Sequence, residues 1–157
     1  MPPTLDRLYL DSCILNRPAD DQTQLRIRAE AHAIEEILEI AADGRIHWIA
    51  SSLVQAELSR NPDQSNRADS LRIMRQAAEF VAPTPATMEQ AAALQAEGFG
   101  QFDALHLALA VQARAGWLLT VDDRFLRRSA RLPPGQFPIV RNPLDWIRRR
   151  KPWLLKS

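Results

Sequence analysis

The chain has 157 residues, which is enough for one domain whose core needs no disulfide or metal to hold it together. Hydrophobic residues make up 46% and charged residues 25%, an ordinary balance for a soluble globular protein. The single cysteine, Cys13, excludes an intrachain disulfide and fits a reducing compartment. No stretch approaches the roughly 20 apolar residues of a membrane span, and the N-terminus lacks the pattern of a signal peptide. We therefore expect a cytoplasmic protein without a membrane partner.

The formal net charge of +1 excludes neither a nucleic acid nor a neutral partner. The kind of basic residue is more informative, because lysine occurs only at Lys151 and Lys156 and nearly all the positive charge is arginine. Arginine suits bidentate contact with phosphate and stacking on bases. A high-GC coding bias gives the same enrichment, so composition alone does not select the partner.

In the first half of the chain, short apolar runs alternate with helical patterns, which is typical of an α/β domain with a mainly parallel sheet. Residues 26–42 place apolar side chains at the i, i+3, i+4 spacing of one buried helix face, and Gly44 ends this helix. Ser51 or Ser52 is expected to cap the next helix. In chain order we expect a strand at 7–10, a polar loop through 24, a helix at 26–42, a strand at 46–50, a helix to about 60, a helix at 67–79 with Ala78 facing inward, and a strand at 80–81.

In the second half, Thr87 is expected to cap a helix that ends near Gly98. A further helix begins around Phe102 or Asp103 and ends before Gly116. We then expect a strand at 117–121, a short helix at 123–128, a last strand at 138–140, and a C-terminal helix at 142–151 that opens on an Asn-Pro pair.

Four acidic residues share one kind of location on this outline. Asp11 and Asp122 each stand where a predicted strand ends, Glu57 lies on the helix after the second strand, and Asp103 opens the helix that leads into the fourth strand. In an open parallel sheet, the carboxyl ends of the strands and the neighbouring helix starts line one crevice, where ligands bind. We therefore expect these acids to converge, although an Asp that follows a strand is also a common helix cap.

Converging carboxylates repel one another and lose hydration, so several in one pocket need a cation. Carboxylates and water suit Mg²⁺ or Mn²⁺, which prefer oxygen ligands. Such a cation can activate a water molecule and neutralise charge that builds on a phosphodiester. The acids therefore predict a route to nucleic acid hydrolysis that needs no protein nucleophile.

The segments around these acids resemble the motifs of PIN domains. YLDSCILNRP at 9–18 resembles the first motif, SSLVQAEL at 51–58 the second, FDALHLA at 102–108 the third, and LTVDDRF at 119–125 the fourth. All four occur in order, and together they cover most of the chain.

The resemblance implies one PIN-like domain over 1–157, with a motif-bearing core at about 7–140, folded as a three-layer α/β/α sandwich. It implies a ribonuclease that depends on Mg²⁺ or Mn²⁺, with Asp11, Glu57, Asp103 and Asp122 as the catalytic and metal-binding acids. Many small bacterial members are VapC-type toxins of type II toxin–antitoxin pairs, so a cognate antitoxin and a homodimer are also expected. The alternative is a PIN-like domain that binds RNA or protein without cleaving.

The resemblance also assigns supporting roles. Ser12 and Thr120 match the hydroxyl positions that steady the acids or a water molecule, and Asp123 is held as a reserve ligand. Candidate RNA-binding residues are Arg17, beside the first acid, and Arg124 and Arg128, which cluster with Arg127 and Arg131 just past Asp122. A solvated helix face explains the arginines after Asp122 equally well.

Two further residues have a structural and a functional interpretation. His106 follows Asp103 by three residues, so it can touch the site, but a histidine that is packed inside the sheet–helix interface is the favoured interpretation. Cys13 is expected to point into the core, with a catalytic thiol as a minor alternative. Other enzyme classes fail on their motifs: a haloacid-dehalogenase-type phosphatase needs an acid where Cys13 stands, and a P-loop and a serine nucleophile elbow are absent.

Overall fold

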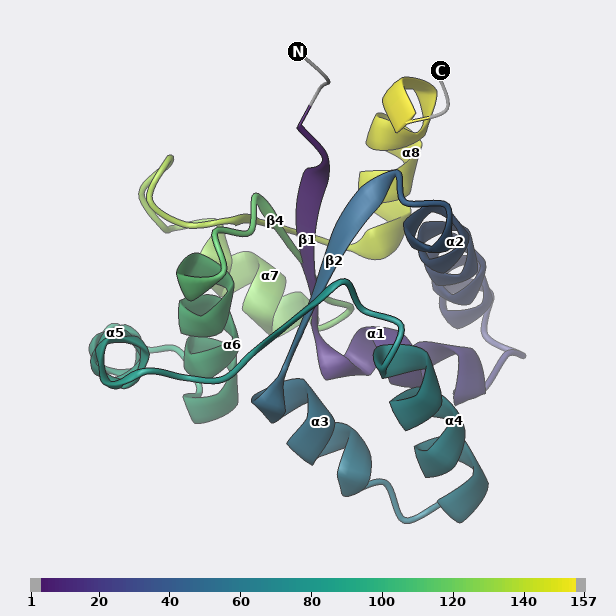
Figure 1. Cartoon of the computed structure of the whole chain (residues 1–157), viewed down its shortest axis with the longest axis horizontal. Coiled ribbons are helices and arrows are strands. Elements are labelled where there is room, and N and C mark those ends of the chain that lie inside the picture. The colour runs from purple at the N-terminus through teal and green to yellow at the C-terminus, as the bar shows by residue number, and fades with distance from the viewer. Residues whose placement is uncertain (1–3, 155–157) are drawn as a thin grey trace.

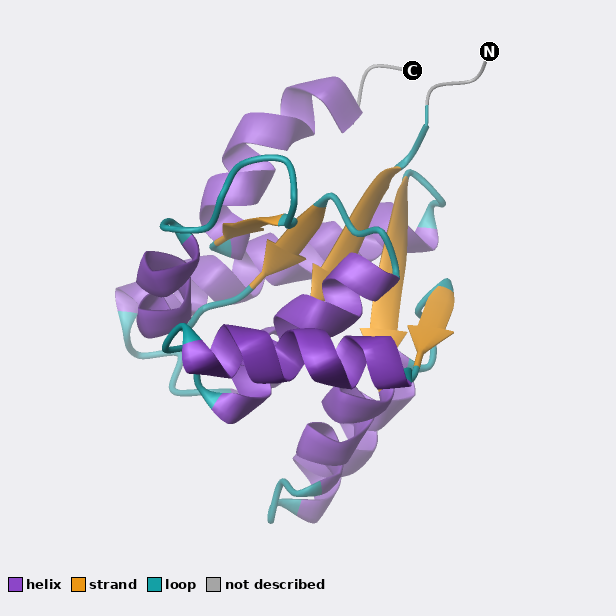
Figure 2. Ribbon diagram, turned by 90° about the vertical axis from the view of Figure 1, so that its left-hand side faces the viewer, coloured by secondary structure: helices purple, strands orange, loops and turns teal. Residues whose placement is uncertain are grey.

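The computed structural model describes residues 4–154, which contain a five-stranded, all-parallel sheet in the order β3-β2-β1-β4-β5 (Figures 1 and 2). The strands are β1 Asp6–Leu10, β2 Ile46–Ser51, β3 Glu79–Val81, β4 Trp117–Leu119 and β5 Ile139–Arg141. The helices are α1 Ser12–Asn16, the 3-10 helix η1 Arg17–Ala19, α2 Leu25–Ala42, α3 Ser52–Ser59, α4 Gln64–Met74, α5 Pro85–Ala96, α6 Gln101–Gln112, α7 Asp123–Ser129 and α8 Pro143–Leu154.

Strand β1 lies at the centre of the sheet and of the core. Leu8, Tyr9 and Leu10 are all but inaccessible to solvent, because β2 and β4 flank the strand and helices cover both faces. The chain passes from β1 through β2 to β3 on one side and then places β4 and β5 on the other. The strand order therefore reverses at β1, and the crevice beyond the carboxyl ends of β1 and β4 is the place where open α/β sheets bind ligands.

Two helix pairs form the outer layers. Helices α2 and α8 pack on each other and α2 contacts β2, whereas α5 packs on α6 and α6 contacts β4. Figure 1 shows the two pairs on opposite sides of the sheet. Helix α8 is anchored by Trp146 and Ile147, which are buried, and the Trp146 ring meets that of Trp117 edge-on, with 6.3 Å between the ring centroids. The predicted α/β/α fold with a parallel sheet is confirmed.

Several predicted boundaries in the middle of the chain are wrong because side chains cap helices earlier than expected. Helix α4 begins at Gln64, since the Asp63 side chain accepts a hydrogen bond from the Asn66 amide at 3.0 Å. It ends at Met74, and Ala78, predicted to face inward, is exposed just before β3. The cap of α5 is Thr84 instead of Thr87, which completes a capping box with it from inside the first turn.

Further corrections concern the segments that follow β1 and β4 at the carboxyl edge of the sheet, and the end of α6. The segment after β1, expected to lead into a loop, forms helix α1 and then η1. The fourth strand ends at Leu119, so Thr120 and Val121 leave the sheet before α7 begins. Helix α6 ends at Gln112, earlier than the predicted end just before Gly116, and the chain turns at Arg114, which has a positive backbone angle (φ 58°). In the part of the chain that the structure describes, no helix has the length and apolarity needed to cross a membrane.

Candidate active site

Three side chains from three separate elements meet at the carboxyl end of β1. Asp11 follows β1 directly, Glu57 lies on α3, and His106 lies on α6. One donor atom from each of the three lies within 4.8 Å of the other two. His106 Nε2 is 3.2 Å from Asp11 Oδ1 and also contacts Glu57 Oε1. Asp11 and His106 are buried, whereas the Glu57 side chain keeps 24% of its surface exposed, so the cluster opens to solvent on the side of Glu57.

The Asp11 carboxylate is held by short-range polar contacts. The backbone amide of Asp11 donates to Leu119 O at 3.1 Å, which ties the end of β1 to the end of β4. Thr120 Oγ1 donates to Asp11 Oδ2 at 2.9 Å, and Ser12 Oγ donates to Oδ1 at 3.3 Å. The Asp122 amide donates to the same Thr120 oxygen at 3.2 Å. The Thr120 hydroxyl therefore links the side chain of Asp11, which follows β1, to the backbone of Asp122, which follows β4.

His106 is packed in the interior, as the sequence favours, and it also belongs to the acid cluster. Its Nδ1 lies 2.7 Å from the Tyr9 hydroxyl, which lies 2.7 Å from Ser51 Oγ. Ser51 Oγ accepts a hydrogen bond from the Val54 amide and so caps α3, the helix that carries Glu57. The spacing of residues in the sequence places Tyr9 and His106 beside the acids, although it does not specify the contact between His106 and Glu57. Tyr9 and Asp11 share one face of a strand, and His106 follows Asp103 by one helical turn.

Asp103 lies in the first turn of α6 and shares the electrostatic field of the other acids. Burial, which is the largest cause, and the charges of Asp11 and Asp122 together raise its pKa to about 6 against the opposing effect of His106. The pKa of His106 is also raised: burial alone would lower it, but Asp11 and Glu57 together outweigh burial. Asp103 therefore interacts with the other three predicted acids, and His106 is the basic group among them.

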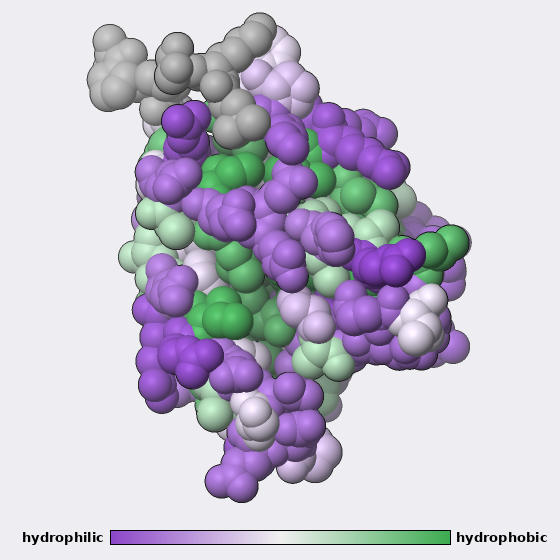
Figure 3. Space-filling view, turned by 90° about the vertical axis from the view of Figure 1, so that its right-hand side faces the viewer, coloured by the Kyte–Doolittle hydropathy of each residue, from purple (hydrophilic) through white to green (hydrophobic). Residues whose placement is uncertain are grey.

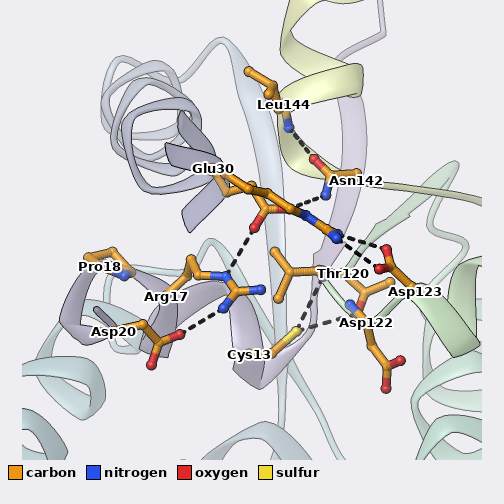
Figure 4. Close-up of polar contacts among 12 residues, drawn as sticks. Cys13, Arg17, Pro18, Asp20, Glu30, Thr120, Asp122, Asp123, Asn142 and Leu144 are labelled. Carbon is orange, nitrogen blue, oxygen red and sulfur yellow. Dashed lines mark hydrogen bonds and ion pairs between the residues drawn. The ribbon is translucent and has the colours of Figure 1, made fainter. Parts of the chain in front are cut away.

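Asp122 and its neighbour Asp123 differ in what they contact. Asp122 caps α7, with Oδ1 accepting from the Arg124 amide at 2.9 Å and from the Phe125 amide at 3.4 Å. Asp123 instead binds both guanidinium nitrogens of Arg26, at 2.7 and 2.8 Å. In Figure 4 the two carboxylates point in opposite directions, with Asp123 turned toward Glu30. The structure thus places Asp122 with the acid cluster and Asp123, the reserve ligand, in a separate ion-pair network.

The thiol of Cys13 lies beside Asp11 and Thr120. Cys13 Sγ lies 3.3 Å from Asp11 Oδ2 and 3.3 Å from Thr120 Oγ1. Burial raises the pKa of Cys13 well above its usual value, and the charge of Asp11 acts in the same direction. A protonated thiol is a poor nucleophile, so the site gives no support to the minor alternative of thiol catalysis.

The candidate RNA-binding arginines fall into two groups. Arg17 is mostly buried, and its guanidinium lies 3.2 Å from Glu30 and 3.1 Å from Asp20. The contact with Glu30 is an ion pair whose geometry does not meet that of a hydrogen bond. Arg124 and Arg128, by contrast, are exposed, and with two further arginines they line a hollow of about 340 Å³ on α7 and just beyond it.

A larger hollow than the one at α7 lies elsewhere. It has a volume of about 570 Å³ and lies between α2 and α8, with Leu144 and Ile147 among its apolar residues and Arg148 and Lys151 at its rim. Figure 3 shows the face that carries these helices, where apolar patches lie among hydrophilic side chains. None of the four acids lines this hollow, so the chemistry indicated by the sequence belongs to the carboxyl edge of the sheet instead.

The fold and the site together define an α/β domain that gathers carboxylates at the carboxyl edge of a parallel sheet, beside the point where the strand order reverses. A sequence model of the PIN domain family matches residues 8–131, which include all four acids. The chain therefore belongs to the PIN domain family, whose members are generally nucleases, and the predicted membership is confirmed.

A solved structure shares this fold. A chain of the crystal structure of VapBC2 from Rickettsia felis, bound to a DNA fragment from their promoter, aligns with a TM-score of 0.58 and 18% identity. The alignment covers 87% of this chain and 98% of that one. At this identity the likeness is one of fold. No curated protein sequence matches the chain.

The donor set of the cluster fits a divalent cation. Asp11 and Glu57 offer carboxylate oxygens and His106 offers an imidazole nitrogen, all of which are metal ligands in proteins. Burial raises the pKa of Asp103, and the neighbouring acids Asp11 and Asp122 raise it as well, so the ionised carboxylates at this edge repel one another. A bound cation would reduce that repulsion.

Proposed function

We propose that the protein is a metal-dependent endoribonuclease that hydrolyses RNA phosphodiester bonds, with Asp11, Glu57, Asp103 and Asp122 as its acidic site. The observation that carries the proposal is the convergence of the Asp11, Glu57 and His106 donor atoms within 4.8 Å, in a chain of the PIN domain family. Mg²⁺ or Mn²⁺ is the cation that a carboxylate-rich site favours.

When bound, such a cation would lower the pKa of a coordinated water and neutralise charge on the phosphate. The residues of the chain have distinct parts in this proposal. Asp11 is fixed by Thr120 and Ser12, so it presents its oxygens in one orientation. Glu57 is the most exposed of the three clustered side chains and is therefore placed to orient an attacking water. Asp103 and Asp122 complete the negative charge that the cation requires.

RNA is the proposed substrate because the arginines past Asp122 lack acidic partners. Across residues 4–154, Arg124, Arg127, Arg128 and Arg131 form no salt bridge, whereas Arg7, Arg17, Arg26 and Arg150 each pair with a carboxylate. Like charges at i, i+3 and i+4 repel one another, so an anion bound among them is favourable. Phosphates of an RNA strand that enters the site past α7 would supply it.

The physiological role that we propose is the toxin half of a type II toxin–antitoxin pair. The fold shared with a VapBC2 chain supports this role and, with it, a cognate antitoxin as partner. A homodimer belongs to the same proposal. The second candidate function is a PIN domain that binds RNA without cleaving it, and the experiment below separates the two.

The test is cleavage of a structured RNA pool by the purified full chain, with Mg²⁺, with Mn²⁺ and with a chelator. Asp11→Asn and Asp103→Asn are prepared in parallel, together with Asp69→Asn as a control, because Asp69 is an exposed acid that pairs with Arg72 on α4. We expect cleavage that needs metal, disappears in the two site variants and persists in the control. Equal cleavage by all four proteins would reveal a contaminant. Metal-independent RNA binding without cleavage would favour the second candidate function.

A further inference from the structure

The acid cluster contains one nitrogen donor, His106, in a position that an all-carboxylate site would not need. We propose that His106 Nε2 is itself a metal ligand, so that the site is a mixed nitrogen–oxygen centre that selects Mn²⁺ and later transition metals over Mg²⁺. This inference rests on the proposed metal-dependent function and adds a ligand and a selectivity to it.

The first argument is the spacing of the donor atoms. Two ligands at right angles around a cation, each bonded at about 2.1 Å, lie about 3.0 Å apart. His106 Nε2 and Asp11 Oδ1 are separated by 3.2 Å, and Glu57 Oε1 contacts the same nitrogen from another element. The Nε2–Oδ1 pair is therefore at a ligand-to-ligand distance, and Nε2 and Glu57 Oε1 share a hydrogen bond whose proton a cation among the three atoms would replace.

The second argument is the other side of the imidazole ring. A histidine that binds a metal nearly always donates its second ring N–H to a neighbouring group, which fixes the ring and the tautomer. His106 Nδ1 lies 2.7 Å from the Tyr9 hydroxyl oxygen, and that hydroxyl is 2.7 Å from Ser51 Oγ. With Nδ1–H donating to Tyr9 and Tyr9 donating to Ser51, Nε2 is the nitrogen that faces Asp11 and Glu57, and its lone pair is available to a cation that displaces the Nε2 proton.

The third argument is burial. The His106 side chain is 1% exposed, and the ring of Tyr9 meets it edge-on, with 5.6 Å between the centroids. A ring held on all sides cannot swing away from the site to reach solvent. Its nitrogen therefore stays beside any cation that Asp11 and Glu57 bind.

The consequence is a change in metal preference. Carboxylates and water serve Mg²⁺ and Mn²⁺ alike, whereas imidazole favours transition metals, in the rising order from Mn²⁺ through Co²⁺ to Ni²⁺. A site with His106 as ligand should therefore bind Mn²⁺ and Co²⁺ more tightly than Mg²⁺. The same site without that nitrogen should lose most of the difference.

The deciding experiment is pulsed electron paramagnetic resonance of Mn²⁺ bound to the full chain, with histidine at natural abundance and with ¹⁵N-labelled histidine. The chain has three histidines, so the assignment needs few variants. We expect a directly bound nitrogen whose signal changes with the isotope, persists in His32→Gln, and is lost in His106→Gln. His32 is the matched control because it is exposed on α2.

Calorimetric titration with Mn²⁺ and Mg²⁺ supplies the second readout. Removal of a group that orients a ligand costs about 10- to 100-fold in metal affinity, so we expect at least that loss for Mn²⁺ in His106→Gln and a smaller loss for Mg²⁺. Tyr9→Phe keeps the imidazole but removes its hydrogen-bond partner, and we expect an intermediate loss of Mn²⁺ affinity. Tyr9→Phe and the labelled wild type keep the test valid if His106→Gln does not fold.

The outcomes separate this inference from the proposed function. Mn²⁺ bound without any nitrogen signal would overturn the ligand role and leave His106 as a residue that only orients Asp11 and Glu57, while metal-dependent cleavage would still stand. Absence of Mn²⁺ binding altogether would overturn both. A nitrogen signal without cleavage would support the ligand and reject the nuclease.

Discussion

Among residues 4–154, two side-chain carboxylates are almost completely buried, those of Glu30 and Asp11, and they differ in the charges that surround them. Glu30 on α2 is 1% exposed and is surrounded by Arg17, Arg26 and the Asn142 amide. Figure 4 shows this network, which ties η1, α2 and the start of α8 together. The chain itself supplies the groups that balance the Glu30 charge.

Asp11 is 6% exposed, yet its neighbours are hydroxyls, a thiol, further acids and a single histidine. Negative charge therefore exceeds positive charge around Asp11 but not around Glu30. Burial of unpaired carboxylates is unfavourable, so a fold that keeps such an excess is arranged for a cation that comes from outside. We therefore expect structural acids in this protein to be buried with their counter-ions and functional acids to be buried without them.

The largest expected effect is that of Asp103→Asn on cleavage. We expect a loss of at least about 100-fold, because a ligand should matter more than the groups that orient ligands. The same change should stabilise the metal-free protein at pH 7, since burial and neighbouring acids disfavour the ionised Asp103 carboxylate. Cleavage rate and thermal melting of one preparation measure both effects. A variant that lost stability together with activity would mean that Asp103 is a structural acid like Glu30.

Glu30→Gln should have the opposite effect to Asp103→Asn: it should lower stability and leave the metal site intact. Removal of one partner from a buried ion pair typically costs about 3 to 5 kcal/mol of unfolding free energy, and here Arg17 and Arg26 keep Asp20 and Asp123 as remaining partners. We expect a loss near the lower end, because half of the Arg26 side chain is exposed and can be hydrated. Urea unfolding measures this value. Folded Glu30→Gln should retain metal binding, and loss of metal affinity at full stability would contradict the comparison.

The pH dependence of metal affinity should report Asp103. Its pKa in the folded, metal-free protein is raised to about 6, above the ordinary value of 3.8 for an aspartate. The metal-free fold therefore loses stability from Asp103 as the pH rises through 6, and metal binding, which needs the ionised form, strengthens over the same range. Calorimetry from pH 5 to 7.5 should show affinity that falls below pH 6. Asp103→Asn should flatten this part of the profile, and an unchanged profile would assign it to another group.

Arg127→Gln/Arg128→Gln should weaken RNA binding without changing the metal site. Each phosphate contact on a single strand contributes about 0.7 to the slope of log affinity against log salt, so loss of two contacts should reduce the slope by about 1.4. Binding is measured with Asp11→Asn as background, so that the RNA stays intact. Arg28→Gln/Arg75→Gln is the control, because both arginines are exposed and the change in charge is equal. Equal slopes in the two double variants would leave the α7 arginines as a solvated face.

The sequence predicted the fold and the edge at which the four acids lie because both depend on regular rules. Apolar periodicity and alternation of strands with helices specify a parallel sheet, and the carboxyl ends of its strands meet at one edge. Local motifs then supplied the family. Helix α1 was missed, because its five residues are too few to establish a periodic pattern.

The parts that were not predicted depend on contacts between residues far apart in the chain. His106 reaches Glu57 across 49 residues, and Arg26 reaches Asp123 across 97. No local spacing specifies such pairs. The sequence therefore predicted that Asp122 lies at the edge of the sheet. It did not predict that its neighbour Asp123 is neutralised by Arg26.

Asp123→Asn gives the smallest expected effect and the most direct test of this distinction. Asp123 is exposed and bound by both nitrogens of Arg26, and these hydrogen bonds lower its pKa. Exposed ion pairs contribute little to stability, so melting should barely change, and cleavage should match the wild type. Asp122→Asn, one residue earlier, should lose cleavage but keep the cap of α7, because the Asn side-chain oxygen accepts the same amide hydrogen bonds. If Asp123→Asn instead lost activity to the same extent, the ion pair with Arg26 would have to open during catalysis. An acid with its own counter-ion would then be functional, and the rule drawn from Glu30 and Asp11 would fail.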